Sequence, residues 1–211
     1  MLSVSNIKKS FNHRSVLKNV SFSVKEGETV VIMGKNGAGK STLLRIMARI
    51  MTCDGGEISF QNGDVLRGFP STRKKILYLG HAPAMYTALS AVENLKLAME
   101  LRGITVNKSK IKNQLNQFGL MNQCDDPISI YSQGMLQRLK LTYAELAYWD
   151  LLLIDEPFSG LDKEGIDLMD NAINRWSVKG KSICMVLHDQ KKAENYGDRI
   201  LHLNNGIFLN T

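Results

Sequence analysis

The chain has few cysteines and no long apolar segment. Only three of its 211 residues are cysteines, and they are widely spaced, so neither a disulfide framework nor a cysteine metal site is expected. Its most apolar runs, such as residues 151–154, are far shorter than the roughly 20 residues that a membrane-spanning helix needs. The N-terminus has no apolar segment followed by a small-residue cleavage site. We therefore expect a cytoplasmic protein that does not itself cross a membrane.

Internal repeats, low-complexity tracts and aromatic residues interleaved with basic ones are also missing. The net charge is +7, from 27 Lys and Arg against 20 Asp and Glu. A positive field attracts polyanions, but these basic residues form short scattered clusters that are typical of solvated faces. We therefore expect no nucleic-acid partner, whereas an anionic membrane surface would suit the charge.

Hydrophobic residues make up 44% of the chain, which is enough for a packed core. Residues 1–80 contain short β-prone runs separated by turns, and Asn62-Gly63 is typical of a two-residue hairpin turn. Residues 89–147 carry apolar residues at three- and four-residue intervals, which predicts helices. After residue 147, apolar strands alternate with helices, as in a parallel sheet covered on both faces. The pattern predicts an α/β fold with an N-terminal antiparallel β subdomain and an inserted α-helical subdomain.

Residues 34–42 read GKNGAGKST, between the β-prone run ETVVIM and the helical run TLLRIMARI. This is the G-x-x-x-x-G-K-[ST] pattern of a phosphate-binding loop in its strand-loop-helix context. Its glycines let successive backbone N–H groups point at phosphate oxygens, and the helix N-terminus adds positive charge. Lys40 is expected to reach the β- and γ-phosphates, and Ser41 to coordinate a magnesium ion. The predicted nucleotide-binding residues of this loop are Gly34, Asn36, Gly37, Ala38, Gly39, Lys40, Ser41 and Thr42.

Two adjacent carboxylates end the apolar run LLLID at Asp155 and Glu156. Ligands of open α/β sheets bind at the carboxyl ends of the strands. We expect Asp155 to hold the magnesium ion and Glu156 to polarise the attacking water. His188 follows the next apolar strand, where it can contact the γ-phosphate and the same water.

Taken together, these motifs resemble the ATP-binding subunits of ABC transporters over essentially the whole chain. YSQGMLQR at 131–138 is similar to the family signature, with Ser132 and Gly134 in the expected places. Phe11 and Val16 resemble the loop that stacks on adenine, and SGLD at 159–162 resembles the loop that crosses the dimer interface through Asp162. The resemblance implies a P-loop NTPase (RecA-like) core that binds ATP and Mg²⁺ and pairs head to tail in an ATP-bound homodimer. It also implies integral membrane subunits on other chains.

The sequence departs from the common family pattern in two motifs. The signature has Tyr131, Gln133 and Met135 where Leu, Gly and Gln are commonest, and His81 stands where the family usually has a Gln. The string LGHAP, followed by LSAVENL, resembles the ATPases of cytochrome c maturation haem exporters, which also have His at that position. This resemblance implies that the chain takes part in haem export. The plainer alternative makes His81 a tolerated substitute in an ATPase that serves another exporter.

The sequence therefore predicts one ABC ATPase domain over residues 1–211. The nucleotide-binding core and β subdomain occupy 1–80 and 148–211, and the helical subdomain with the signature occupies 81–147. The expected function is ATP hydrolysis that drives export through a separate membrane subunit, with the chain peripheral on the inner face of the cell membrane. More remote alternatives are a soluble P-loop kinase and a non-transport ABC ATPase. In the helical lobe, Met85 and Tyr86 either contact the membrane partner or belong to the core of their own lobe.

Overall fold

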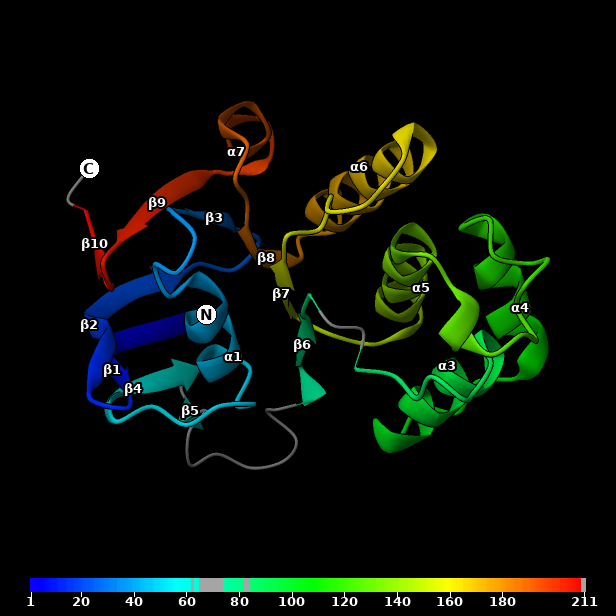
Figure 1. The fold of residues 1–211 in the computed structure, drawn as a ribbon, viewed down its shortest axis with the longest axis horizontal. Helices are drawn as coiled ribbons and strands as arrows, with labels where there is room; N and C mark the ends of the chain where they lie inside the picture. Colours follow the sequence, from blue (N-terminus) through cyan, green and yellow to red (C-terminus); the bar gives the residue numbers. More distant parts are fainter. Residues whose placement is uncertain (62, 65–73, 82–83, 210–211) are drawn as a thin grey trace. The chain divides into compact units, whose positions relative to one another are not determined.

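The computed structural model describes residues 1–61, 63–64, 74–81 and 84–209 (Figure 1). Two compact units divide the chain: Met1–Gly80, Trp149–Glu156 and Arg175–Thr211 form the first unit, and His81–Tyr148 and Pro157–Asn174 form the second. The sequence pattern, by contrast, assigned 157–174 to the nucleotide-binding core. The elements in chain order are β1 (Leu2–Phe11), β2 (Arg14–Val24), β3 (Thr29–Met33), α1 (Lys40–Met47), β4 (Gly55–Phe60), β5 (Gly63–Asp64), β6 (Ile76–Leu79), α3 (Ala91–Leu101), α4 (Lys108–Gln117), η1 (Ile128–Ile130), α5 (Gln133–Leu146), β7 (Leu151–Asp155), α6 (Lys163–Val178), β8 (Ser182–Val186), α7 (Gln190–Tyr196), β9 (Arg199–Asn204) and β10 (Ile207–Phe208).

An antiparallel sheet in the first unit has the strand order β2-β1-β4-β5. β1 pairs with β2 on one side and with β4 on the other, both antiparallel. Along these strands the buried residues are separated by one to three more exposed ones, and the β1–β2 pairing contains register shifts. β4 and β5 also pair antiparallel, with Phe60 opposite Gly63; Asn62, in the predicted hairpin turn, lies outside the described residues. The antiparallel β subdomain is confirmed.

A second sheet in the same unit has the order β10-β9-β3-β8-β7-β6. Its strands from β9 to β6 are parallel, and only the edge strand β10 is antiparallel. β3, β7 and β8 are buried along their whole length, which explains why their sequences are continuous apolar runs. Because parallel strands end at the same edge, the loops after β3, β7, β8 and β9 lie along one side of the sheet.

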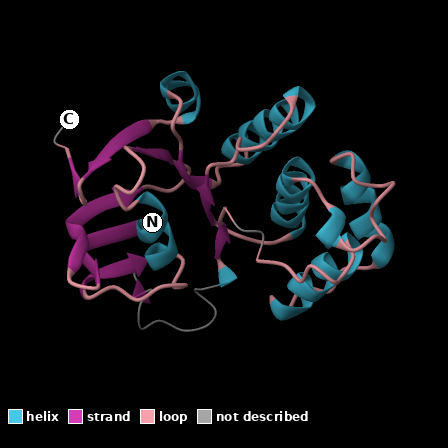
Figure 2. Cartoon of the chain, in the orientation of Figure 1, coloured by secondary structure: helices cyan, strands magenta, loops and turns pink. Residues whose placement is uncertain are grey.

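Helices form the described part of the second unit, whereas the strands fall in the first (Figure 2). α3 begins with a capping box: the Ser90 side chain accepts from the Glu93 backbone N–H, and the Glu93 carboxylate accepts from the Ser90 backbone N–H. Its buried positions include Ala91, Leu95 and Met99, each four residues apart. This spacing places the apolar stripe of α3 against its neighbours. The predicted α/β P-loop fold with a helical subdomain is thus the observed fold.

Candidate functional site

The loop from Gly34 to Gly39 turns back from β3 and leads directly into α1. The Lys40 ammonium donates to the backbone carbonyl of Gly34 at 2.8 Å and to that of Lys35 at 3.0 Å, so the side chain lies across its own loop. Burial lowers the pKa of Lys40, an effect that the carboxylates of Glu156 and Asp155 oppose. The lysine is therefore held at the loop by neutral acceptors that an anionic ligand can replace.

Gly39 brings this loop against β2. A Cβ at Gly39 would lie 2.8 Å from the Leu17 side chain and 3.1 Å from the Val16 carbonyl oxygen, and the residue has φ +105°. Any other residue would have to displace the Leu17 side chain and would strain the backbone at this positive φ. The glycine of the motif therefore sets the distance between the phosphate-binding loop and the strand that carries Val16.

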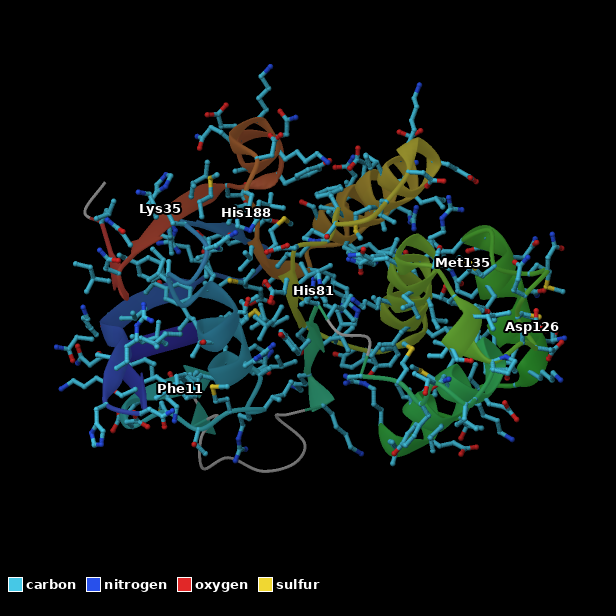
Figure 3. All side chains as sticks on the ribbon, in the orientation of Figure 1. Phe11, Lys35, His81, Asp126, Met135 and His188 are labelled. Atoms are coloured by element: carbon cyan, nitrogen blue, oxygen red, sulfur yellow. The ribbon has the colours of Figure 1, made fainter. Side chains whose placement is uncertain are left out.

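A cavity of about 860 Å³ opens in front of this loop. Phe11, which is 43% exposed, and Val16 line it from the β1–β2 side, and Figure 3 labels Phe11 in this unit. From the phosphate-binding loop it is lined by Asn36, Gly37, Gly39, Lys40, Ser41 and Thr42, and from the other elements by Arg14, Ser15, Lys18, Glu156, Asn205 and Gly206. Most of the predicted nucleotide-binding residues therefore face one cavity, whereas Gly34 and Ala38 support its loop from outside the lining.

The strand-end residues Glu156 and His188 are in contact. His188 Nε2 lies 2.8 Å from Glu156 Oε1, and both residues follow neighbouring parallel strands, β7 and β8. Glu156 has φ +51°, a left-handed backbone that a residue with a side chain rarely adopts. Such strain persists where surrounding contacts impose it and is concentrated at functional sites. Here the Glu156 carboxylate lines the cavity and contacts His188.

Asp155, one residue earlier, is buried with 3% of its surface exposed. Its Oδ1 atom has no hydrogen-bond partner within the described ranges of the chain. A buried carboxylate oxygen without a partner is costly unless a cation or ordered water satisfies it. The Asp155 Oδ1 atom is therefore available to bind a cation or a water molecule at the edge of the sheet.

The second unit contains a smaller cavity of about 370 Å³, lined by the signature residues Ser132 and Gly134 and by Asp162. Ser132 caps α5, since its hydroxyl accepts from the Met135 backbone N–H at 3.2 Å. Arg138, which is 9% exposed, donates to both carboxylate oxygens of Asp162, at 2.8 and 3.1 Å, and to Glu164 at 3.1 Å. The Arg138 guanidinium holds the pKa of Asp162 below its ordinary value. The signature helix and the SGLD loop are thus joined by an ion pair.

His81 begins the second unit and is exposed. Its backbone carbonyl accepts a hydrogen bond from the buried Lys140 at 2.7 Å, so α5 anchors the position directly. Tyr86 is 63% exposed and so lies outside the core of its unit, while Met85 is half-buried. Of the two predicted placements for this pair, the structure removes Tyr86 from the core.

Comparison with protein-family models gives a match to the ABC transporter family over residues 17–159. The chain belongs to the ABC transporter family. Two bacterial relatives show the similarity along almost the full length. The lantibiotic transport ATP-binding protein of Streptococcus pyogenes is 33% identical over 95% of this chain and 85% of its own. The cytochrome c biogenesis ATP-binding export protein of Vibrio cholerae is 31% identical over 92% of this chain and 94% of its own.

Solved structures give the same assignment. An ATP-binding subunit of an ABC transporter has a TM-score of 0.88 and 30% identity, covering 99% of this chain and 88% of its own. An ATP-binding cassette solved as a dimer in a post-hydrolysis state with ADP and Pi has a TM-score of 0.90 at 24% identity, covering 100% and 97%. This ABC transporter subunit is therefore an ATP-binding ATPase. Within its described residues, no helix has the length and apolar character needed to cross a membrane.

Sequence reasoning missed several residues around the two cavities of this ABC ATPase. Arg14, Lys18 and Asn205 line the larger cavity, and Arg138 lines the smaller one. The Asn205-Gly206 pair carried a readable signal, because Asn-Gly between two short β-prone runs is a strong hairpin indication. Arg138 carried no comparable signal, because its ion pair with Asp162 joins residues 24 positions apart.

Proposed function

We propose that this chain hydrolyses Mg-ATP in a head-to-tail homodimer and thereby drives export through a membrane subunit on another chain. One observation carries the catalytic part of the proposal: Glu156 and His188 lie 2.8 Å apart, and Glu156 lines the cavity that also contains Lys40. A carboxylate close to bound phosphates can accept a proton from an attacking water. His188 orients that carboxylate and donates toward the γ-phosphate.

In this proposal the phosphate-binding loop holds the triphosphate. Lys40 exchanges its two carbonyl acceptors for the β- and γ-phosphate oxygens, which form stronger, charge-assisted hydrogen bonds. The backbone N–H groups of the loop and the N-terminus of α1 add further donors. Phe11 and Val16 contact the base at the other end of the cavity.

The residues present also suit a magnesium ion. Mg²⁺ prefers oxygen ligands, and the Ser41 hydroxyl and the Asp155 Oδ1 atom, which has no partner among the described residues, are such ligands. Bound there, the ion would supply positive charge that offsets the negative charge developing on the phosphates. Both Ser41 and Asp155 belong to the first unit.

The dimer part of the proposal rests on the groups that the second unit offers. Its cavity presents Ser132, Gly134 and the first turn of α5, a set that suits a terminal phosphate supplied by another copy of the chain. Asp162 would lie at the interface between the copies. The dimeric state described for the 24% identical cassette is consistent with this arrangement.

For the transported substrate we propose haem, in cytochrome c biogenesis. The similarity to the Vibrio cholerae export protein extends over nearly all of both chains, and the string LGHAP, which contains His81, resembles the ATPases of this group. Export of another substrate is the alternative, and the equally similar lantibiotic transport protein favours it. In either case the chain is peripheral on the inner face of the membrane, with Tyr86 exposed for contact with the partner.

The variant Glu156→Gln tests the catalytic proposal. The amide cannot accept the proton, so turnover should fall at least about 100-fold, while ATP still binds and an ATP-dependent dimer accumulates. Phosphate release and size-exclusion chromatography with and without ATP measure the two effects. Glu57→Gln, at an exposed position in β4, serves as the matched control. Wild-type turnover in Glu156→Gln would show that Glu156 is not the base.

Loss of the chain in its own cell tests the substrate proposal. Cells that carry only Lys40→Ala should lose covalently attached haem from c-type cytochromes while total haem stays unchanged, as measured by haem staining and pyridine haemochrome spectra. Normal c-type cytochromes in such cells would exclude haem export and leave the export of another substrate.

A further inference from the structure

The turn between β9 and β10 brings the polar side chain of Asn205 to the larger cavity, which the phosphate-binding loop also lines. Asn204 pairs with Ile207 across it, and the two residues between them, Asn205 and Gly206, have φ +47° and +82°. A two-residue loop with both central residues at positive φ is the turn type that Asn-Gly prefers. The turn is therefore a rigid, sequence-encoded feature.

Sheet topology places this turn beside the phosphate-binding loop. β9 runs parallel to β3, with Met33 opposite His202, so both strands end at the ligand-binding edge. Gly34 and Leu203, the residues that follow this pair, are in close contact: a Cβ at Gly34 would lie 2.1 Å from the Leu203 carbonyl oxygen. The first residue of the phosphate-binding loop thus packs on the strand that leads into the turn.

The other side of the turn packs on β2. The Lys18 backbone N–H donates to the Gly206 carbonyl at 2.8 Å, and a Cβ at Gly206 would lie 2.3 Å from the Val16 carbonyl oxygen. Phe208, just after the turn, packs edge-on against Phe22 of β2 at 5.3 Å between ring centroids. These contacts fix the turn between the loop that suits phosphates and the strand that carries Val16.

Asn205 is the turn residue whose side chain remains available. It lines the cavity together with Val16 and Lys40, and none of the residues described here bonds to its carboxamide. A carboxamide offers two donors and an acceptor, so it suits the hydroxyl and ring-nitrogen groups of a nucleoside. Its place between the phosphate and base ends favours that part of the ligand over the triphosphate.

We propose that Asn205 hydrogen-bonds to the nucleoside half of the nucleotide and so contributes to selecting nucleoside triphosphates over other polyphosphates. This inference rests on the proposed function, because it requires ATP in the same cavity. Asn205 binds and positions the substrate and takes no part in proton transfer.

The variant Asn205→Gly tests the inference, because Gly-Gly keeps the turn type while the side chain is removed. Binding of ATP, 2′-deoxy-ATP and inorganic tripolyphosphate is measured by calorimetry, with thermal unfolding as a check on the fold. We expect ATP affinity to fall about 3- to 10-fold, the loss of one neutral hydrogen bond, with tripolyphosphate affinity unchanged. If 2′-deoxy-ATP escapes the loss, the contact is to the ribose; if it shares the loss, the contact is to the base.

Asn12→Gly is the matched control, since Asn12 is also an exposed turn asparagine at positive φ, +46°. Unchanged ATP affinity in Asn205→Gly, an equal loss for tripolyphosphate, or an equal loss in Asn12→Gly would each overturn the inference. A wild-type chain that binds no ATP would instead overturn the proposed function.

Discussion

The two cavities, one in each unit, differ in the bonds that their cationic side chains make. In the larger cavity, the only bonds of Lys40 to described residues go to neutral backbone carbonyls. In the smaller one, Arg138 is paired with Asp162 and Glu164, and the Ser132 hydroxyl already caps its own helix. An anionic ligand can therefore bind the Lys40 ammonium in the first cavity. In the second cavity, the Arg138 guanidinium already holds two carboxylates in place.

This difference indicates that the two cavities contribute differently to nucleotide binding and to turnover in the proposed site. A cavity of about 860 Å³ with a free phosphate-binding loop has the size and donors for a whole nucleotide. The cavity of about 370 Å³ is smaller, and its shape depends on the Arg138 ion pairs. We therefore expect changes in the phosphate-binding loop of the first cavity to alter nucleotide affinity, and changes in the second cavity to alter turnover at constant affinity.

Lys40→Ala should have the largest effect on binding. Losing a charge-assisted hydrogen bond to phosphate lowers ATP affinity about 10- to 100-fold, and turnover at saturating ATP falls further because transition-state charge loses a partner. Calorimetry and phosphate release measure the two effects. Lys35→Ala is the control within the same loop, because Lys35 is exposed (Figure 3) and only its backbone carbonyl contacts Lys40. Equal ATP affinity in both variants would remove Lys40 from the binding site.

The sequence was sufficient to predict the first cavity where its parts are contiguous or stand at strand ends. Gly34 to Thr42 form one uninterrupted motif, and Glu156 and His188 each follow a buried apolar strand. Parallel strands end at a common edge, so placing the strands also placed these side chains. The positive φ of Glu156 had no sequence signal, because an ordinary glutamate gives no sign of imposed strain.

The remaining parts depend on tertiary packing between distant segments. Arg138 and Asp162 meet because α5 and the SGLD loop pack together, and a Cβ at Gly119 would lie 2.8 Å from Arg138 Nη1. Asn205 reaches the nucleotide cavity because Gly34 and Gly206 permit close backbone contacts. Such contacts are set by the fold as a whole, so local pattern and propensity could not indicate them.

Arg138→Gln should have an intermediate effect, and on turnover alone. Without the ion pair the SGLD loop is no longer held against α5, and misplacing a contributing loop costs about 10-fold or more, while ATP affinity stays within twofold of wild type. Gly119→Ala should act in the same direction by displacing the guanidinium. Arg102→Gln, which removes an arginine hydrogen bond to the Tyr148 carbonyl in the same unit, is the control. A loss of ATP affinity in Arg138→Gln that matches its loss of turnover would contradict the separate roles of the two cavities.

The same pair should also be visible in the pH dependence of stability. Hydrogen bonds from Arg138 hold the pKa of Asp162 below its ordinary value of 3.8. A carboxyl with a lowered folded-state pKa contributes stability above its unfolded pKa and loses it as pH falls through the folded value. The difference in unfolding temperature between wild type and Arg138→Gln should thus be constant from pH 7 to about 5 and shrink below pH 3.8. A difference that persists undiminished to pH 2 would exclude Asp162 as its source.

Gln133→Gly should have the smallest effect, because the Gln133 amide reaches the Ser159 hydroxyl only at 3.4 Å, and turnover should change less than about threefold. Its side chain matters mainly as a neighbour of Gly160, where a Cβ would lie 2.7 Å from Gln133 Cδ. Gly160→Ala should therefore reduce turnover more in the wild-type background than in Gln133→Gly, where the clash is gone and only the strain of φ +73° remains. Phosphate release from the four chains of this cycle measures the coupling. An equal loss in both backgrounds would mean that Gln133 does not shape the smaller cavity.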